Sequence, residues 1–235
     1  MHTHHDGSAT GAATDATDAS EANDGTAAPS AREWWEARYA ERDGIWSGRV
    51  NAVLASVTWG LPVGRALDLG CGEGGDVVWL AEQGWDVTGI DLSVTALQRG
   101  SRAAVAAGVQ EQTAFVAADL ARWDTAARFD LVTASFLQSW PVEIPRADIL
   151  HRAAGFVAAG GHLLVTAHAA PPHDELPPEL REYRFPAPAD DLAALQLDDR
   201  WDVLVAEVRP RTATTPEGDP HEVLDSVVLA RLTRG

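Results

Sequence analysis

The chain has 235 residues, of which 46% are hydrophobic, and this is enough apolar bulk for one folded domain with a buried core. Its 35 acidic residues outnumber its 18 basic ones and give a formal net charge of −17, which argues against nucleic acids and membrane surfaces as partners because both attract basic side chains. No apolar run approaches the length of a membrane span, and the single cysteine, Cys71, excludes an internal disulfide and suits a reducing cytoplasm.

The first segment, residues 1–28, carries acids but no base and has almost no bulky apolar residues, so we expect a disordered acidic tail. One domain is expected over residues 29–235. It begins at Ser30, which has a glutamate three residues later as in a capping box, and the helix that follows carries Trp35 and Tyr39. The aromatic residues of this opening fit either a helix that covers the core or a lid over a bound ligand.

The next predicted element is a short strand that leads into a glycine-rich turn and a helix. Glycine accepts φ > 0 and has no Cβ, so such a turn lets a ligand approach bare backbone. Two motifs overlap in the turn. Gly70, Gly72 and Gly75 satisfy the pattern G-x-G-x-x-G, which predicts a nicotinamide dinucleotide. The residues Asp68, Gly70, Gly72 and Gly74 spell D-x-G-x-G-x-G.

Acidic residues around the turn discriminate between the two motifs. A pyrophosphate would lie at the helix N-terminus, where N–H groups and the helix dipole favour negative charge, but Asp68, Glu73 and Asp76 crowd that position with carboxylates. The same acids attract a cofactor that has a positive ammonium and sulfonium and no phosphate, which describes S-adenosylmethionine. In this turn the chain resembles the class I S-adenosylmethionine-dependent methyltransferases, whose first motif is a strand followed by D-x-G-x-G-x-G.

The ends of the next two predicted strands fit the same resemblance. Asp91 ends the second strand, where a carboxylate accepts hydrogen bonds from both hydroxyls of a ribose, and Leu92 follows, where a side chain packs against an adenine face. After the third strand, the resemblance implies that Asp119 receives the adenine amino group, with the ring nitrogen at a neighbouring backbone N–H near Leu120. We therefore expect the cofactor to contact Asp68, Gly70, Cys71, Gly72, Gly74, Asp91, Leu92, Asp119, Leu120, Ser135, Trp46 and Arg49.

A second resemblance lies before the glycine turn. Trp46, Gly48, Arg49 and Asn51 approximate a W-x-x-G-x-x-N stretch. With the Trp/Tyr-rich opening, this stretch is similar to that of the thiopurine and tellurite-resistance type methyltransferases. Arg49 is expected to hold the cofactor carboxylate through a bidentate pair, the alternative being a surface salt bridge. The expected substrate pocket consists of Trp35, Tyr39, Phe136 and His173.

The remaining segments complete a doubly wound sheet. We expect helices over residues 51–59, 93–107 and 146–157, and strands over residues 66–69, 85–90, 114–118, 129–134, 162–168, 202–209 and 223–232. Prolines break the stretch from 171 to 188, which is expected to be a loop near the pocket. The fold class is α/β: a Rossmann-like, doubly wound, seven-stranded sheet, mostly parallel with one antiparallel strand, and with helices on both faces. The antiparallel strand is implied by the resemblance.

Ligands in such sheets lie beyond the carboxyl ends of the strands, so the acceptor is expected near the ends of the fourth and fifth strands. The segment that begins with Ser135 and Phe136 lacks the paired prolines that hold the target amine in some methyltransferases, which argues against an exocyclic amine. A base is needed only if the acceptor arrives protonated, and a thiol, with a pKa of about 8.5, is already partly ionised. His168 at the end of the fifth strand is the tentative catalytic base, and an ordinary polar strand end is the alternative.

Together these features predict an enzyme that transfers the methyl group of S-adenosylmethionine to a small molecule and releases S-adenosylhomocysteine. A thiol or similar soft nucleophile is favoured as the acceptor. The alternatives are an O- or N-methyltransferase of a natural-product pathway, a non-catalytic module that binds S-adenosylmethionine, and an NAD-dependent oxidoreductase. No metal, nucleic acid or membrane partner is expected, and the sequence leaves the oligomeric state open.

Overall fold

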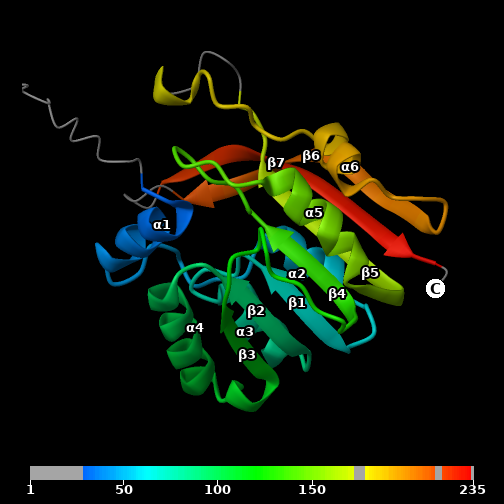
Figure 1. Ribbon diagram of the computed structural model, residues 1–235, viewed down its shortest axis with the longest axis horizontal. Helices are drawn as coiled ribbons and strands as arrows, with labels where there is room; N and C mark the ends of the chain where they lie inside the picture. Colours follow the sequence, from blue (N-terminus) through cyan, green and yellow to red (C-terminus); the bar gives the residue numbers. More distant parts are fainter. Residues whose placement is uncertain (1–28, 172–177, 215–218, 234–235) are drawn as a thin grey trace, which may run out of the picture.

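The computed structural model describes residues 29–171, 178–214 and 219–233 (Figure 1). The predicted tail, residues 1–28, and the predicted pocket residue His173 lie outside the described residues. The strands are β1 (Arg65–Leu69), β2 (Asp86–Asp91), β3 (Thr113–Ala117), β4 (Phe129–Ser135), β5 (Val157–His168), β6 (Trp201–Thr214) and β7 (Pro220–Leu232). The α-helices are α1 (Ala31–Ala40), α2 (Ala52–Thr58), α3 (Gly75–Glu82), α4 (Val94–Ala107), α5 (Arg146–Gly155) and α6 (Pro188–Leu195).

All the strands belong to one sheet with the order β3-β2-β1-β4-β5-β7-β6. Strands β1 to β5 pair in parallel, and β7 runs antiparallel to both β5 and β6. The predicted seven-stranded, mostly parallel sheet with one antiparallel strand is therefore confirmed. Strand β1 pairs with β2 on one side and β4 on the other, so the strand order reverses there. In open α/β sheets this reversal opens a crevice at the carboxyl ends of the strands.

Helices cover both faces of the sheet, and each face has its own apolar core. On one face α2, α3 and α4 bury Leu54, Leu80 and Leu97 against the strands. On the other face α5 and α6 bury Leu150 and Leu195, and Figure 1 shows these two helices next to each other. The sheet is thus rigidly packed on both sides, which fixes the positions of the strand ends where the site lies.

Two helices begin as the sequence predicts because their first N–H groups are capped. The Glu33 N–H donates to Ser30 Oγ, and the Glu33 carboxylate accepts the Ser30 N–H at 2.9 Å, which completes the capping box of α1. At the start of α4, Ser93 Oγ accepts the Ala96 N–H at 3.1 Å. This helix ends at Gly108, whose φ of +74° is the left-handed conformation that favours glycine.

The structure departs from the predicted elements toward the C-terminus. Helix α6 lies in a part of the chain for which the sequence predicts no helix or strand. Pro188 suits the first turn of a helix, and in the structure the Asp190 carboxylate accepts the Ala187 N–H at 3.1 Å. Strands β6 and β7 are longer than predicted because their antiparallel pairing runs without a break from Trp201 with Leu232 to Thr214 with Pro220, apart from one shift of register. Within the described ranges, no helix is long and apolar enough to cross a bilayer.

Candidate active site

The glycine turn between β1 and α3 has the backbone that D-x-G-x-G-x-G requires. Gly70, Gly72 and Gly74 have φ values of +77°, +52° and +78°, all in the left-handed region. Gly75, which only the dinucleotide motif uses, does not have a positive φ. A Cβ on Gly75 would instead lie 3.1 Å from the carbonyl oxygen of Gly48, so this position is restricted by the opening segment.

One buried carboxylate and two partly buried ones surround the turn. Asp68, in β1, is 2% exposed and accepts the Thr133 hydroxyl at 2.7 Å, while Asp76 accepts the Asn51 N–H at 2.7 Å. Burial, and then the charge of Asp76, raise the pKa of Asp68 to about 8. Burial also raises the pKa values of Asp76 and Asp91. Among the described residues, no arginine or histidine forms an ion pair with any of the three.

Glu73, the fourth acid at the turn, holds the α1–α2 loop (residues 41–51). Its carboxylate accepts the Ile45 N–H at 3.0 Å and the Trp46 N–H at 2.9 Å. It also pairs with Arg99 of α4 at 2.7 Å, and Arg99 in turn donates to the carbonyl oxygen of Tyr39 at 2.8 Å. Glu73 therefore fastens the α1–α2 loop to the glycine turn.

The aromatic residues of α1 and of the α1–α2 loop lie over the glycine turn. They therefore combine the two expected roles, which were to cover the core and to cover a bound ligand. Tyr39 is buried, as in a helix that covers the core, but its hydroxyl would lie 2.9 Å from a Cβ on Gly72. Trp46 donates its indole N–H to the Tyr39 hydroxyl at 3.0 Å, and Trp35 donates to the Ser139 hydroxyl at 3.0 Å. The opening thus forms one wall over the glycine turn and reaches the segment after β4.

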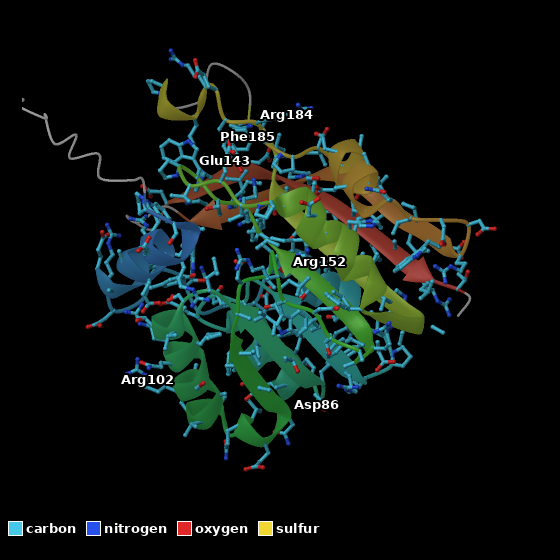
Figure 2. The ribbon with its side chains drawn as sticks, in the orientation of Figure 1. Asp86, Arg102, Glu143, Arg152, Arg184 and Phe185 are labelled. Carbon is cyan, nitrogen blue, oxygen red and sulfur yellow. The ribbon has the colours of Figure 1, made fainter. Side chains whose placement is uncertain are left out.

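A cleft of about 1280 Å³ opens between these elements. Its lining includes the expected cofactor and pocket residues Trp35, Tyr39, Trp46, Arg49, Asp68, Gly70, Cys71, Gly72, Asp91, Leu92, Asp119, Leu120, Ser135, Phe136 and His168. Gly74 is outside this lining, since its α-carbon faces Phe115 and Gly100. Figure 2 shows Glu143, another lining residue, toward the end of the molecule that carries Arg184 and Phe185.

At one end of the cleft, polar groups lie after β2 and β3. Asp91 accepts the N–H groups of Gly72 and Ser93, each at 2.9 Å. Asp119 accepts the Ala121 N–H at 2.9 Å through Oδ1. The backbone therefore orients both carboxylates while leaving lone pairs for a ligand, since each carboxylate has about four acceptor positions.

At the other end of the cleft, the structure adds residues that the sequence analysis missed. The rings of Phe136 and His168 stack at 4.3 Å with an interplanar angle of 20°. Asp225 of β7 lies 3.7 Å from Nδ1 of His168 and pairs with Arg211 of β6 at 2.5 Å. Gln138 Oε1 accepts the His168 N–H at 2.6 Å. Asp225 is the one carboxylate in the predicted strand over residues 223–232, and this signal in the sequence could have found it.

Comparison with known proteins places this cleft in context. A family model described as a methyltransferase domain matches residues 66–161. The chain is similar to the probable thiol methyltransferase 2 of Arabidopsis thaliana, with 35% identity over 101 residues that cover 42% of this chain and 45% of that protein. It is 35% identical to thiocyanate methyltransferase 1 of the same plant over 101 residues, which cover 42% of this chain and 44% of that protein. The chain spans less than half the length of these curated relatives.

Solved structures extend the likeness to most of the fold. One described as "Conversion of a Disulfide Bond into a Thioacetal Group during Echinomycin Biosynthesis" has a TM-score of 0.67 and 23% identity, and covers 86% of this chain and 92% of that one. TehB from Haemophilus influenzae has a TM-score of 0.59 and 18% identity, and covers 77% of this chain and 62% of that one. At these identities the likeness shows a shared fold, so the chemistry must be argued from the residues of the cleft.

Proposed function

We propose that this chain is a class I S-adenosylmethionine-dependent methyltransferase and that it transfers a methyl group to a small-molecule acceptor in the cleft. The observation that carries the proposal is a group of carboxylates beside a glycine turn in the left-handed conformation: Asp68 is buried, and Asp76 and Asp91 are partly buried. A cofactor with a positive ammonium and sulfonium would supply the positively charged partner that these acids lack among the described residues. A pyrophosphate would add to their repulsion.

The residues around the turn fit this cofactor. Asp91, whose position is fixed by two N–H groups, would accept the ribose hydroxyls, and Asp119 would accept the adenine amino group through the oxygen that Ala121 does not use. Ser135 lines the cleft, and its buried Oγ lies beside the Asp76 carboxylate, where it would contact a ligand. When bound, the cofactor supplies an electrophilic methyl group on a positively charged sulfur.

Other expected cofactor contacts have more restricted roles. Trp46 and Arg49 line the cleft from the α1–α2 loop, and we retain Arg49 as the partner of the cofactor carboxylate. Burial and the nearby carboxylates raise the pKa of the Cys71 thiol well above its ordinary value. Cys71 therefore stays a neutral thiol and acts as a small residue of the turn rather than as a nucleophile.

We propose a thiol or similar soft nucleophile as the acceptor. Two curated relatives named thiol and thiocyanate methyltransferases support this, and the segment after β4 lacks the paired prolines of amine methyltransferases. Phe136, Trp35 and the half-exposed His168 line the part of the cleft beyond the glycine turn. There Phe136 and Trp35 would hold the apolar part of an acceptor and exclude water, and His168 would accept its proton. An oxygen or nitrogen acceptor is the alternative, and a reducing cytoplasm is the proposed location.

The cofactor assignment is tested first, by thermal unfolding with S-adenosylhomocysteine or NADH. We expect S-adenosylhomocysteine to raise the melting temperature of the wild type and NADH to leave it unchanged, because only a state that binds the ligand is stabilised. Asp91→Ala should weaken S-adenosylhomocysteine binding about 100-fold, which corresponds to the loss of one or two hydrogen bonds to a charged group.

Asp86→Ala is the matched control for that variant. Asp86 is an exposed carboxylate at the other end of the same strand, as Figure 2 shows, and its removal should leave binding unchanged. Stabilisation by NADH alone would overturn the proposal in favour of an oxidoreductase. A binding module that does no chemistry would show normal S-adenosylhomocysteine binding and no turnover across a broad panel of thiols, phenols and amines.

A further inference from the structure

An acid–histidine pair lies at the acceptor end of the cleft. His168 is the last residue of β5, and Asp225 is its direct partner on the antiparallel strand β7. The two side chains approach to 3.7 Å between Nδ1 of His168 and Oδ1 of Asp225. The Asp225 side chain is fully buried, whereas the His168 side chain is 52% exposed and lines the cleft. The buried acid thus lies behind the imidazole, and the other edge of the ring remains for a ligand.

Arg211 of β6 keeps Asp225 charged and fixed. Its guanidinium donates from Nε to Oδ2 at 2.5 Å and from Nη2 to Oδ1 at 3.3 Å, which occupies both carboxylate oxygens. Burial by itself would raise the pKa of Asp225, but the hydrogen bonds and charges of His168 and Arg211 outweigh it and lower that pKa. Asp225 is therefore a carboxylate whenever His168 is in a position to accept a proton.

The imidazole is also held from its other sides. Phe136 stacks on it at 4.3 Å, and the guanidinium of Arg211 lies 5.5 Å from the centre of the Phe136 ring. Gln138 fixes the backbone by accepting the His168 N–H at 2.6 Å and donating to the Tyr183 hydroxyl at 3.2 Å. The charged and titratable groups that face His168 are thus Asp225 and Arg211, with Tyr183 reached through Gln138. Such a ring keeps one orientation without a bound ligand.

We propose that Asp225 is a positioning residue that keeps the proton of neutral His168 on Nδ1, so that Nε2 accepts a proton from the acceptor. The inference rests on the proposed methyl transfer and deepens it by naming the acceptor class, which is a protonated thiol or hydroxyl rather than a preformed anion. A carboxylate at Nδ1 selects this tautomer and stabilises the imidazolium that forms. A site for a preformed anion such as thiocyanate would need no proton acceptor.

In this step the acceptor loses a proton and gains a methyl group. The acceptor S–H or O–H bond breaks, its proton moves to Nε2 of His168, and the electron pair left on the acceptor atom forms the new bond to the methyl carbon. The pair that joined that carbon to the donor sulfur stays on the sulfur. Because His168 is half-exposed, its proton then leaves to solvent, while Asp225 stays ionised throughout.

A series of acceptors tests the proposal by activity. We compare thiocyanate and a strongly acidic thiophenol, which are anions at neutral pH, with alkyl thiols, which are mostly protonated. His168→Gln and Asp225→Asn should lower kcat for the alkyl thiols about 100-fold, with KM nearly unchanged, and should alter the pH dependence of kcat. For the acceptors that are already ionised, the loss should stay within about 3-fold. Glu222→Gln, an exposed carboxylate-to-amide change on the same strand, should leave all rates unchanged.

Equal losses for ionised and protonated acceptors would overturn the proposal, since they would indicate that the pair only shapes the pocket. No loss for the alkyl thiols would overturn it as well. If the wild type binds S-adenosylhomocysteine but methylates no acceptor, the proposed function fails, and the tautomer measurement below still tests the pair itself.

Nitrogen NMR of the His168 imidazole gives a readout that is independent of turnover. In the neutral wild-type protein we expect the proton on Nδ1, and in Asp225→Asn we expect a shift toward the tautomer with the proton on Nε2. A wild-type protein with the proton on Nε2 would overturn the inference. If Asp225→Asn does not fold, Arg211→Gln serves as the second variant. It leaves the carboxylate in place but removes its fixed partner, and should produce a smaller shift in the same direction.

Discussion

At the residue scale, the glycine turn shows how closely the opening segment and the cofactor end of the cleft fit together. Gly72 combines a φ of +52° with a Tyr39 hydroxyl that would lie 2.9 Å from an added Cβ. An alanine there faces two costs, because the left-handed conformation is unfavourable for a residue with a Cβ and because the phenol must move. We expect Gly72→Ala to lower the free energy of unfolding by about 2–4 kcal/mol in urea denaturation.

Gly108→Ala separates these two costs. Gly108 has a φ of +74°, but an added Cβ would meet nothing within 4 Å, so this variant carries the conformational cost alone. We expect a loss of about 1–2 kcal/mol. Equal losses in the two variants would contradict the tight contact between Tyr39 and the turn.

The site residues that follow strands were predictable from the sequence, and those that depend on register were not. Asp68 and Asp91 lie at the ends of strands that local pattern reveals, and the structure brings both into the cleft. The pairing of Asp225 with His168 and Arg211 depends on how β7 aligns with β5 and β6, which are far from each other in sequence. A shift of one residue would turn Asp225 to the other face of the sheet, and only packing of the whole sheet fixes that choice.

At the element scale, strands β1 to β5 were predictable because each contains a run of apolar and β-branched residues, and glycines precede β1, β2 and the predicted part of β5. Helix α6 was not, because its short run follows a stretch rich in proline and contains two consecutive acids, Asp190 and Asp191. Its position depends on a tertiary contact, the ion pair of buried Asp191 with Arg146 of α5. Arg146 also donates to the carbonyl oxygen of Leu137 at 2.8 Å, so α6 is tied to the segment that follows β4.

The α1–α2 loop is the element whose position depends most on a single side chain. Glu73→Gln removes the charge that pairs with Arg99 and weakens the acceptor of the Ile45 and Trp46 N–H groups. We expect the opening free energy of residues 44–50 to fall by about 1–2 kcal/mol, seen as faster hydrogen exchange in this loop. Because Trp46 and Arg49 line the cleft, binding of S-adenosylhomocysteine should weaken about 3- to 10-fold.

The control is Glu111→Gln, an exposed acid between α4 and β3 that lies outside the cleft lining, and this change should alter neither exchange nor affinity. If Glu73→Gln weakens binding while exchange in the loop is unchanged, Glu73 contacts the ligand directly and the anchoring role is wrong.

At the scale of the whole molecule, the buried acids make stability depend on pH. Burial raises the pKa values of Asp68, Asp76 and Asp91, so the folded chain keeps protons that the unfolded chain releases, and stability falls as pH rises through that window. Burial acts in the same direction at Glu36 and Asp225, but hydrogen bonds outweigh it and lower their pKa values. The ionised carboxylates of Glu36 and Asp225 therefore stabilise the fold, and this stabilisation is lost as pH falls through their lowered pKa values. The apo protein should therefore be most stable in mildly acidic solution.

Asp68→Asn isolates the largest of these contributions. The pKa of Asp68 is near its ordinary value of 3.8 in the unfolded chain and about 8 in the folded chain. As pH rises from the first value to the second, the wild type therefore loses stability relative to the variant. The amide oxygen can still accept the Thr133 hydroxyl. We expect Asp68→Asn to be about as stable as the wild type near pH 4, and more stable by about 1–3 kcal/mol above about pH 8, in urea denaturation. A variant that is less stable at every pH would show that the Asp68 charge does not destabilise the apo fold.

The same charge that destabilises the empty protein is the one that a cationic cofactor neutralises. S-adenosylmethionine should therefore raise the melting temperature of the wild type more than that of Asp68→Asn, so the gap between the two proteins narrows or reverses when the ligand is present. If the ligand stabilised both proteins equally, Asp68 would play no part in binding, and its burial without a positively charged partner would have no functional explanation.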